Sequence, residues 1–161
     1  MPKLDLSRIA PQQGTRYPGK LARTVDGRSW QAVGDAGGLT QYGVNLVTLA
    51  PGAASSLRHY QMQQEEFAMV TKGELVLIEN DGETVLQPGD CAAWPAGVPN
   101  GHHLINRSAQ PASFLVIGTR TATETVFYSD VDMMVTVDDT GDHFTKQDGS
   151  PLAADQIGDD K

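Results

Sequence analysis

The feature of this chain that most constrains its fold is a series of short strand-like runs separated by turn residues, from about residue 30 to residue 118. Two of the turns are explicit: Asn80-Asp81-Gly82, which is a good hairpin signal, and Pro88-Gly89-Asp90. No internal repeat or low-complexity segment interrupts the series. Short strands at regular spacing with turns between them predict an all-β sandwich or jelly-roll barrel.

The expected strands can be placed by their alternating apolar residues. They cover residues 30–33, 39–49, 66–71, 74–79, 84–87, 91–94, 102–106 and 111–118, followed by 125–128 and 133–137. Residues up to about 28 have scattered Pro and Gly and little periodicity, so we expect an arm that lies over the barrel. The end of the chain is polar and rich in Gly and Asp. We therefore expect a single domain over 1–161, with a barrel core at about 30–120, an N-terminal arm and a C-terminal extension.

Four polar side chains lie where this pattern points them into the barrel: His59, Gln61, Glu66 and His102. Residues two apart on a strand share a face, so His59 and Gln61 point the same way. A carboxylate inside a barrel is costly unless it is paired or bound to a metal, which favours a ligand role for Glu66. Two imidazoles and one carboxylate are the smallest set that holds a first-row transition metal with positions left open.

The adjacent residue His103 is an alternative to His102. Alternation places His102 on the same face as Leu104 and Asn106, and His103 on the other. A bulge between residues 97 and 101 would exchange the two imidazoles.

Gln61 leaves the strength of the site open. Its side-chain oxygen is a neutral, hard and poor ligand compared with imidazole, and it shifts preference toward metals that accept oxygen. Gln61 could be a weak fourth ligand, or it could lie behind a three-ligand face. Alternatively, the site holds no metal, and the polar cluster binds water or a small ligand directly.

Composition and charge limit the kinds of molecule that this chain is expected to bind. The chain has 161 residues, of which 39% are hydrophobic, so it can bury a sizeable core. Its net charge of −8 argues against nucleic acid and anionic membranes as partners, and ten of the 20 acidic residues follow residue 120. The N-terminus has no apolar signal region, so we expect a cytoplasmic protein. The single cysteine, Cys91, cannot form an internal disulfide and is expected to be buried.

Two blocks of sequence resemble a known family. PGAASSLRHYQMQQEEFAMVTKG (51–73) and GDCAAWPAGVPNGHHLIN (89–106) resemble the cupin superfamily motifs G-x5-H-x-H-x3,4-E-x6-G and G-x5-P-x-G-x2-H-x3-N. Gln61 stands where the second motif histidine is expected, and His102 lies two residues later than the motif places it after Gly97. Gly52 opens the first block with one extra residue before His59, and His102 keeps the expected distance to Asn106. The positions that fit the spacing are Glu66, Gly73, Gly89, Pro95 and Gly97. Within the superfamily the chain resembles small cupins described as mannose-6-phosphate-isomerase-like, through EEF at 65, GDC at 89, PAGV at 95 and HHLINRS at 102.

The resemblance implies a cupin jelly-roll barrel and a divalent metal, namely Zn, Mn, Fe or Ni, held by His59, Gln61, Glu66 and His102. Three functions remain open. The first is an isomerase that acts on a sugar or sugar phosphate, with Glu66 moving a proton. The second is a metal-dependent oxygenase that uses the same ligands. The third is a binding or sensing module without catalysis. Each would take a small-molecule partner.

A phosphorylated substrate needs a cation at the mouth of the barrel. The cations near the motif strands are Arg58, Lys72, Arg107 and Arg120. Alternation turns Arg58 away from His59, and Arg120, which follows an apolar strand, is the best of the four.

Apolar side chains are also expected on the outside of the barrel. Phe67, Met69, His103 and Ile105 would project outward and need a cover, from either the N-terminal arm or a second subunit. Resemblance to small cupins favours a two-fold homodimer.

Overall fold

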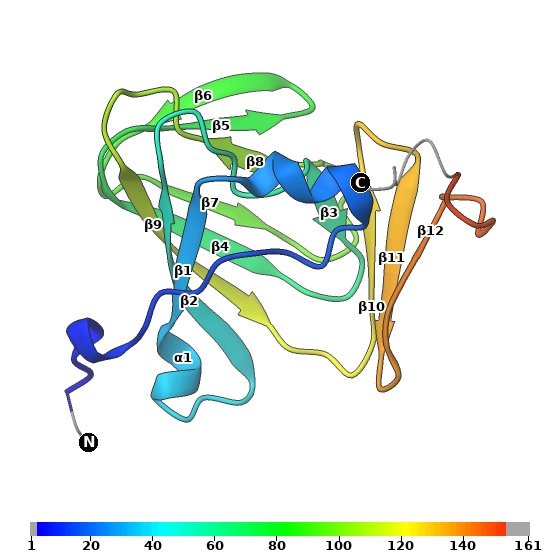
Figure 1. Cartoon of the computed structure of the whole chain (residues 1–161), viewed down its shortest axis with the longest axis horizontal. Coiled ribbons are helices and arrows are strands. Elements are labelled where there is room, and N and C mark those ends of the chain that lie inside the picture. The colour runs from blue at the N-terminus through cyan, green and yellow to red at the C-terminus, as the bar shows by residue number, and fades with distance from the viewer. Residues whose placement is uncertain (1–2, 154–161) are drawn as a thin grey trace.

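The computed structural model describes residues 3–153, which fold into three antiparallel sheets (Figure 1). The all-β architecture that the sequence predicts is confirmed. One sheet has the order β1 (Arg28–Ala32), β2 (Tyr42–Leu49), β9 (Ala112–Thr119), β4 (Glu66–Lys72), β7 (Cys91–Trp94). A second has the order β12 (Gly141–Thr145), β11 (Met133–Asp138), β10 (Glu124–Tyr128), β3 (His59–Gln61), and a third the order β6 (Gly82–Leu86), β5 (Leu75–Glu79), β8 (His103–Ile105). Among residues 3–153 no helix is long and apolar enough to cross a membrane.

The larger hydrophobic core, here called the barrel core, lies between the five-stranded and three-stranded sheets. Leu49 and Leu75 have no exposed surface, and Phe114 is 4% exposed. On β4 the side chains alternate as predicted, with Ala68 buried and Phe67 37% exposed. The remaining buried members are Val47, Ala53, Val70, Leu77, Leu86, Trp94, Leu104 and Ala112. Alternation along the motif strands therefore forms the core, and the same strands carry the polar residues of the site.

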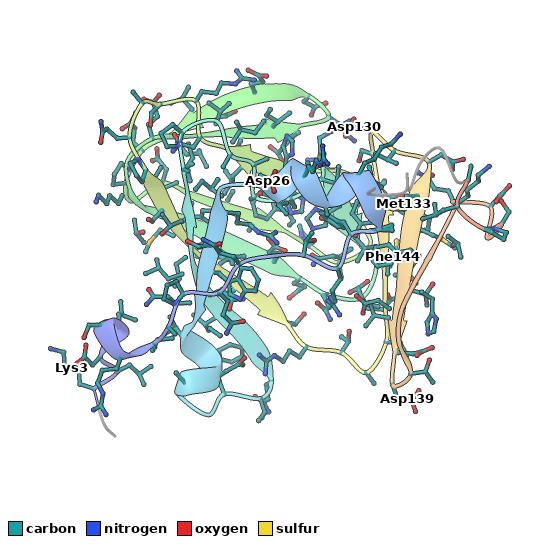
Figure 2. The ribbon with its side chains drawn as sticks, in the orientation of Figure 1. Lys3, Asp26, Asp130, Met133, Asp139 and Phe144 are labelled. Atoms are coloured by element: carbon teal, nitrogen blue, oxygen red, sulfur yellow. The ribbon has the colours of Figure 1, made fainter. Side chains whose placement is uncertain are left out.

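A second core, here called the closing core, joins the N-terminal arm to the C-terminal strands. The arm contains two short 3-10 helices, η1 (Leu6–Arg8) and η2 (Gly19–Val25), and crosses β1 and β2 (Figure 1). Its Tyr17 and Leu21 pack against Tyr128, Met133 and Val135. Figure 2 places Met133 and Phe144 on the C-terminal sheet, beside the arm; Phe144 packs on the same cluster. The predicted arm is confirmed, and it closes one side of the molecule.

The C-terminal strands are part of the same framework as the motif strands. Strand β10 pairs antiparallel with β3, so that Tyr128 lies opposite His59 and Val126 opposite Gln61. The C-terminal extension that the sequence predicts is thus hydrogen-bonded to the strand that carries two of the expected site residues.

The predicted strand at 30–33 ends one residue early, and the one at 39–49 begins late. Val33–Ala36 form a short helix, α1, and β2 starts at Tyr42. Gly34 packs so closely on β2 that a Cβ there would lie 2.8 Å from the backbone nitrogen of Val44. This close approach favours a compact helical turn over continued strand.

Two expectations outside the site are wrong. Strand β12 (Gly141–Thr145) was not expected, because its residues are mostly polar; it forms because it pairs with β11 along its whole length. Cys91 is exposed rather than buried. Trp94 points inward on β7, and alternation along that short strand turns Cys91 outward, beside Met69 of β4.

Four of the motif glycines adopt a backbone conformation that other residues rarely take. The φ angles are +81° at Gly52, +74° at Gly73, +97° at Gly89 and +77° at Gly97. At Gly73 a Cβ would also lie 2.9 Å from the Cβ of Ala112. These glycines are therefore explained by the turns that connect the motif strands.

Candidate metal centre

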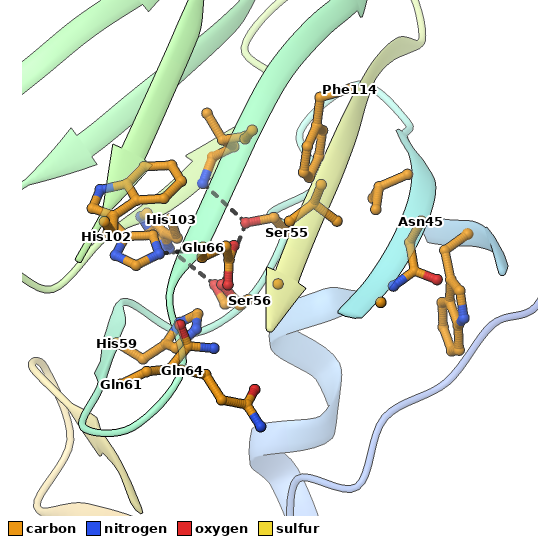
Figure 3. A pocket seen from close by; sticks show the side chains of 18 of the residues that line it. Asn45, Ser55, Ser56, His59, Gln61, Gln64, Glu66, His102, His103 and Phe114 are labelled. Atoms are coloured by element: carbon orange, nitrogen blue, oxygen red, sulfur yellow. Dashed lines mark hydrogen bonds and ion pairs between the residues drawn. The ribbon is translucent and has the colours of Figure 1, made fainter. Parts of the chain in front are cut away.

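Two of the sheets and the segment just before β8 each contribute a residue to one polar cluster (Figure 3). His59 opens β3, Glu66 opens β4, and His102 immediately precedes β8. His59 and His102 pair through their backbones, with His102 N donating to His59 O at 2.9 Å and His59 N donating to His102 O at 3.2 Å. One potential ligand atom from each of His59, Glu66 and His102 lies within 4.8 Å of the others. The fold therefore brings His102 next to two residues that lie far earlier in the sequence, His59 and Glu66.

The tautomers of both imidazoles follow from their backbone contacts. The Nδ1 of His59 lies 2.9 Å from the carbonyl oxygen of Leu57, and that of His102 lies 3.4 Å from the carbonyl oxygen of Asn100. A carbonyl oxygen only accepts, so each Nδ1 carries the hydrogen and each Nε2 keeps a free lone pair. Orientation of this kind is typical of histidines that ligate metals.

His102 provides the observation that best tests whether the cluster fits a metal. Its Nε2 is buried and has no hydrogen-bond partner. It lies 3.9 Å from Oε1 of Glu66, which is too long for a hydrogen bond. The ring is fixed by Trp94, which stacks on it with centroids 3.8 Å apart and planes 6° apart. A buried lone pair that faces a carboxylate and a second imidazole fits a metal ion, because an ion would satisfy all three groups.

The charges of the cluster also suit a metal. Burial lowers the pKa of His59, which keeps that imidazole neutral, as a ligand must be. Burial alone would raise the pKa of Glu66, but the neighbouring imidazoles of His102 and His59 outweigh it, and the pKa of the carboxyl lies below its usual value. Glu66 is therefore ionised, and it is the group of the cluster that brings negative charge.

Gln61 lies beside the cluster, and its amide makes a small contribution to lowering the pKa of Glu66. Two residues after His59 on β3, it lines the same cavity, as alternation predicts. The three groups that could hold a metal are His59, Glu66 and His102, which agrees with a place for Gln61 behind the three-ligand face.

His103 does not belong to the cluster. Its Nδ1 lies 2.9 Å from the carbonyl oxygen of Ser56, so the ring fastens a neighbouring loop, and burial lowers its pKa. Asn106 is fully buried, and its amide donates to Leu49 O at 2.9 Å and to Gln110 O at 2.8 Å. Both residues hold the loops around β8. Burial alternates along this segment, with His102, Leu104 and Asn106 buried and His103 and Ile105 partly buried.

The cluster opens into a cavity of about 580 Å³, adjoined by a second of about 590 Å³. Such volumes are typical of small-molecule sites. Both cavities are lined by Arg16, Tyr17 and Arg28, which the sequence analysis did not single out. Only their position in an irregular N-terminal segment could have drawn attention to them, since an arm over a barrel must cover something.

The four cationic side chains expected near the site differ in their ion pairs and in whether they line a cavity. Arg58 pairs with Asp130 at 2.6 Å, Arg107 pairs with Glu83 at 2.6 Å, and Lys72 is exposed. None of these three is among the residues that line the two cavities. Arg120 lines the first cavity, but it pairs with Asp35.

Another residue that sequence analysis missed is Glu124, a carboxylate that is only 4% exposed. It accepts hydrogen bonds from the backbone N–H groups of Met62 at 2.9 Å, Gln63 at 3.0 Å and Gln64 at 2.6 Å. These residues connect β3 to β4, which carry His59 and Glu66. Glu124 therefore fixes the loop between two members of the cluster.

Comparison with known proteins agrees with this geometry. The family model of the cupin domain matches residues 45–118. The chain is also similar to a protein from Silicibacter pomeroyi, described as a sugar phosphate isomerase from a cupin superfamily. The two are 62% identical with a TM-score of 0.96, over 98% of this chain and 100% of the other. The chain belongs to the cupin superfamily. The resemblance to its sugar-phosphate-isomerase-like members and the jelly-roll fold are confirmed.

More distant cupin-like structures share the fold. A protein from Acidithiobacillus ferrooxidans, described as a proposed sugar phosphate isomerase, is 23% identical with a TM-score of 0.77, over 91% of both chains. The polyketide cyclase RemF from Streptomyces resistomycificus is 17% identical with a TM-score of 0.61, over 74% of this cupin and 79% of the other chain. At such identities the likeness shows the fold alone. A search of proteins with curated functions finds no match.

Proposed function

We propose that this cupin is a metal-dependent enzyme of the sugar-phosphate-isomerase-like kind, acting on a small polar substrate that carries a carbonyl and a hydroxyl group. The observation that carries the proposal is the buried, unpartnered Nε2 of His102, which faces Glu66 beside His59. The 62% identity to a protein described as a sugar phosphate isomerase supports the choice of reaction.

His59, Glu66 and His102 would hold the divalent ion, which we propose to be Zn, Mn, Fe or Ni. The chemistry that such an ion supplies when bound is polarisation of a carbonyl and its neighbouring hydroxyl. Gln61 stands where the cupin motif has a second histidine, so the cluster has two imidazoles rather than three. A donor set with fewer nitrogen atoms favours metals that accept oxygen ligands.

Glu66 is the residue that would move the proton. Among the described residues it is the only carboxylate that lines the first cavity, so carboxylate-based proton transfer there falls to its oxygens. Because its pKa is lowered, the group is ionised and can accept a proton at neutral pH. Gln61 would keep the carboxylate oriented, and Trp94 would keep His102 in place through the stacked contact.

The same observation favours one second candidate, a binding or sensing module without catalysis. If Glu66 serves entirely as a ligand, the described lining of the first cavity offers no other carboxylate to act as a base. In that case we expect ligand binding without turnover.

The test is to load the protein with each of the four metals and follow phosphorylated aldoses and ketoses by NMR in D₂O. An isomerase that uses a base exchanges a carbon-bound hydrogen for deuterium. We expect exchange in the wild type and its loss in Glu66→Gln. Glu65→Gln, at the adjacent exposed carboxylate, is the matched control and retains activity. No exchange with any metal, but measurable binding, would favour the module; consumption of O₂ would favour an oxygenase.

A further inference from the structure

Three arginines, Arg16, Arg28 and Arg120, line the first cavity, and they differ in how their charge is compensated. Arg16 pairs with Asp142 at 2.6 Å, and Arg120 pairs with Asp35. Arg28 has no carboxylate within ion-pair distance in the part of the chain that the structure describes. In an acidic protein, an arginine that no carboxylate neutralises is unusual and needs another explanation.

The guanidinium of Arg28 is held firmly despite the missing counter-charge. Nη1 donates to the carbonyl oxygen of Ser55 at 2.6 Å, and Nη2 donates to that of Gly14 at 2.8 Å. The guanidinium carbon also lies 5.3 Å from the ring centroid of Trp30. These contacts use two of the five N–H groups and bring no negative charge. Arg28 is therefore fixed in place, and its charge remains available.

The environment of Arg28 makes this charge costly. Burial lowers its pKa, and its Nε is buried without a hydrogen-bond partner. A partly buried cation without a counter-ion lowers the stability of a fold unless something compensates for it. An anionic group of a bound ligand would do so, because guanidinium matches the geometry of phosphate and carboxylate oxygens.

Arg28 is also placed to act on the same ligand as the metal cluster. With His59 and Gln61 it lines both adjoining cavities. Tyr17, Arg28 and Glu66 all line the first cavity, and both charged groups act electrostatically on the phenol of Tyr17. A single small molecule can therefore reach both ends.

We propose that Arg28 binds the anionic group, a phosphate or a carboxylate, of a ligand whose carbonyl end lies at the His59–Glu66–His102 cluster. The inference rests on the proposed function and names the substrate class for it. The arm takes part in binding, because Gly14 helps to hold the guanidinium and Tyr17 lies beside it. Arg120, which the sequence favoured for this role, is already neutralised by Asp35.

The test compares three probes by calorimetry: fructose 6-phosphate, gluconate and fructose. We expect at least one anionic probe to bind roughly 10- to 100-fold more tightly than fructose, the range for a hydrogen bond to a charged group. Arg28→Gln should abolish the tighter binding of the anionic probe. Arg28→Lys should keep only part of it, because lysine lacks the planar guanidinium with its paired N–H donors. The matched control, Arg120→Gln, should retain it. The anionic probe that binds distinguishes phosphate from carboxylate.

Equal affinity for all three probes, or an unchanged preference in Arg28→Gln, would overturn the inference. If Arg28→Gln does not fold, Arg28→Lys decides: affinity equal to that of the wild type overturns it. The titrations are made on metal-free and metal-loaded protein, with metal content measured for each variant. Loss of the anion preference with metal retained is expected from the role of Arg28. A wild type that binds no metal contradicts the proposed function, yet the metal-free titration still decides this inference.

Discussion

The barrel core and the closing core differ in origin and in what they position. The barrel core packs the motif strands against one another, and Leu49 and Leu75 within it are completely buried. The closing core brings the N-terminal arm against the C-terminal strands, and most of its members, among them Tyr17 and Phe144, are only partly buried. The first supports the strand that carries Glu66, whereas the second forms the wall that carries Tyr17 and adjoins Arg28. We therefore expect metal binding and ligand selection to depend on different parts of the fold.

The largest effect is expected in the barrel core. Leu49→Ala removes a side chain with no exposed surface, and we expect it to lower the free energy of unfolding by about 2–5 kcal/mol. Metal content should fall as well, because β2 supports β9, which pairs with β4 at Glu66. Urea denaturation and metal analysis measure both quantities. Val85→Ala, at a side chain that is 54% exposed, is the control. A loss below about 1 kcal/mol in Leu49→Ala would contradict the assignment of this core.

A smaller and more selective effect is expected in the closing core. Met133→Ala also removes a fully buried side chain, but its partly buried neighbours can move into the space, so we expect a loss of about 2–3 kcal/mol. Metal should be retained while ligand affinity falls, since the wall that carries Tyr17 is loosened. Met134→Ala, at the adjacent position on β11, serves as the control. If Met133→Ala loses metal as readily as Leu49→Ala does, the two cores are not separate.

The connection between the two cores can be tested at Glu124. In Glu124→Gln an NH₂ group replaces one oxygen that accepts from the backbone between β3 and β4, and a buried donor loses its partner. We expect a loss of about 1–2 kcal/mol in the free energy of unfolding. Hydrogen exchange at the amides of Gln63 and Gln64 should become faster, and Glu65→Gln should leave it unchanged. Unaltered exchange would show that the loop does not depend on the carboxylate.

The smallest effect is expected at the outer turn of the C-terminal sheet. The side chain of Asp138 accepts from the N–H and hydroxyl of Thr140, which lowers its pKa to about 2 from 3.8. Because the folded pKa is the lower one, the stabilisation is present above pH 3.8 and is lost as the pH falls toward 2. Hydrogen exchange at Thr140 should accelerate over this window alone, and in Asp138→Asn the pH step should disappear. A step at higher pH would assign the effect to another group.

What the sequence predicted follows the same division. Alternation placed His59, Gln61, Glu66 and His102 on inward faces. In a strand with one buried face, apolar and polar residues alternate, so the sequence shows which face each residue takes. The same alternation would also have predicted that Cys91 is exposed, because it lies three residues before the inward-facing Trp94 and therefore on the opposite face of β7. The members of the closing core could not be predicted, because they come from opposite ends of the chain. The contact between Tyr17 and Tyr128 depends on the path of the arm over the barrel, which no local pattern in the sequence shows. For the same reason Arg28 was missed, since its lack of a counter-ion is a property of its surroundings.

The most direct test of the account is the metal content of tag-free protein, measured by mass spectrometry after incubation with each of Zn, Mn, Fe and Ni. We expect about one ion per chain in the wild type and its loss in Glu66→Ala and His102→Gln. His103→Gln, at the imidazole that contacts Ser56, should keep its metal. Metal that stays bound in Glu66→Ala, or no binding by the wild type to any of the four ions, would contradict the assignment of a metal centre to this cluster.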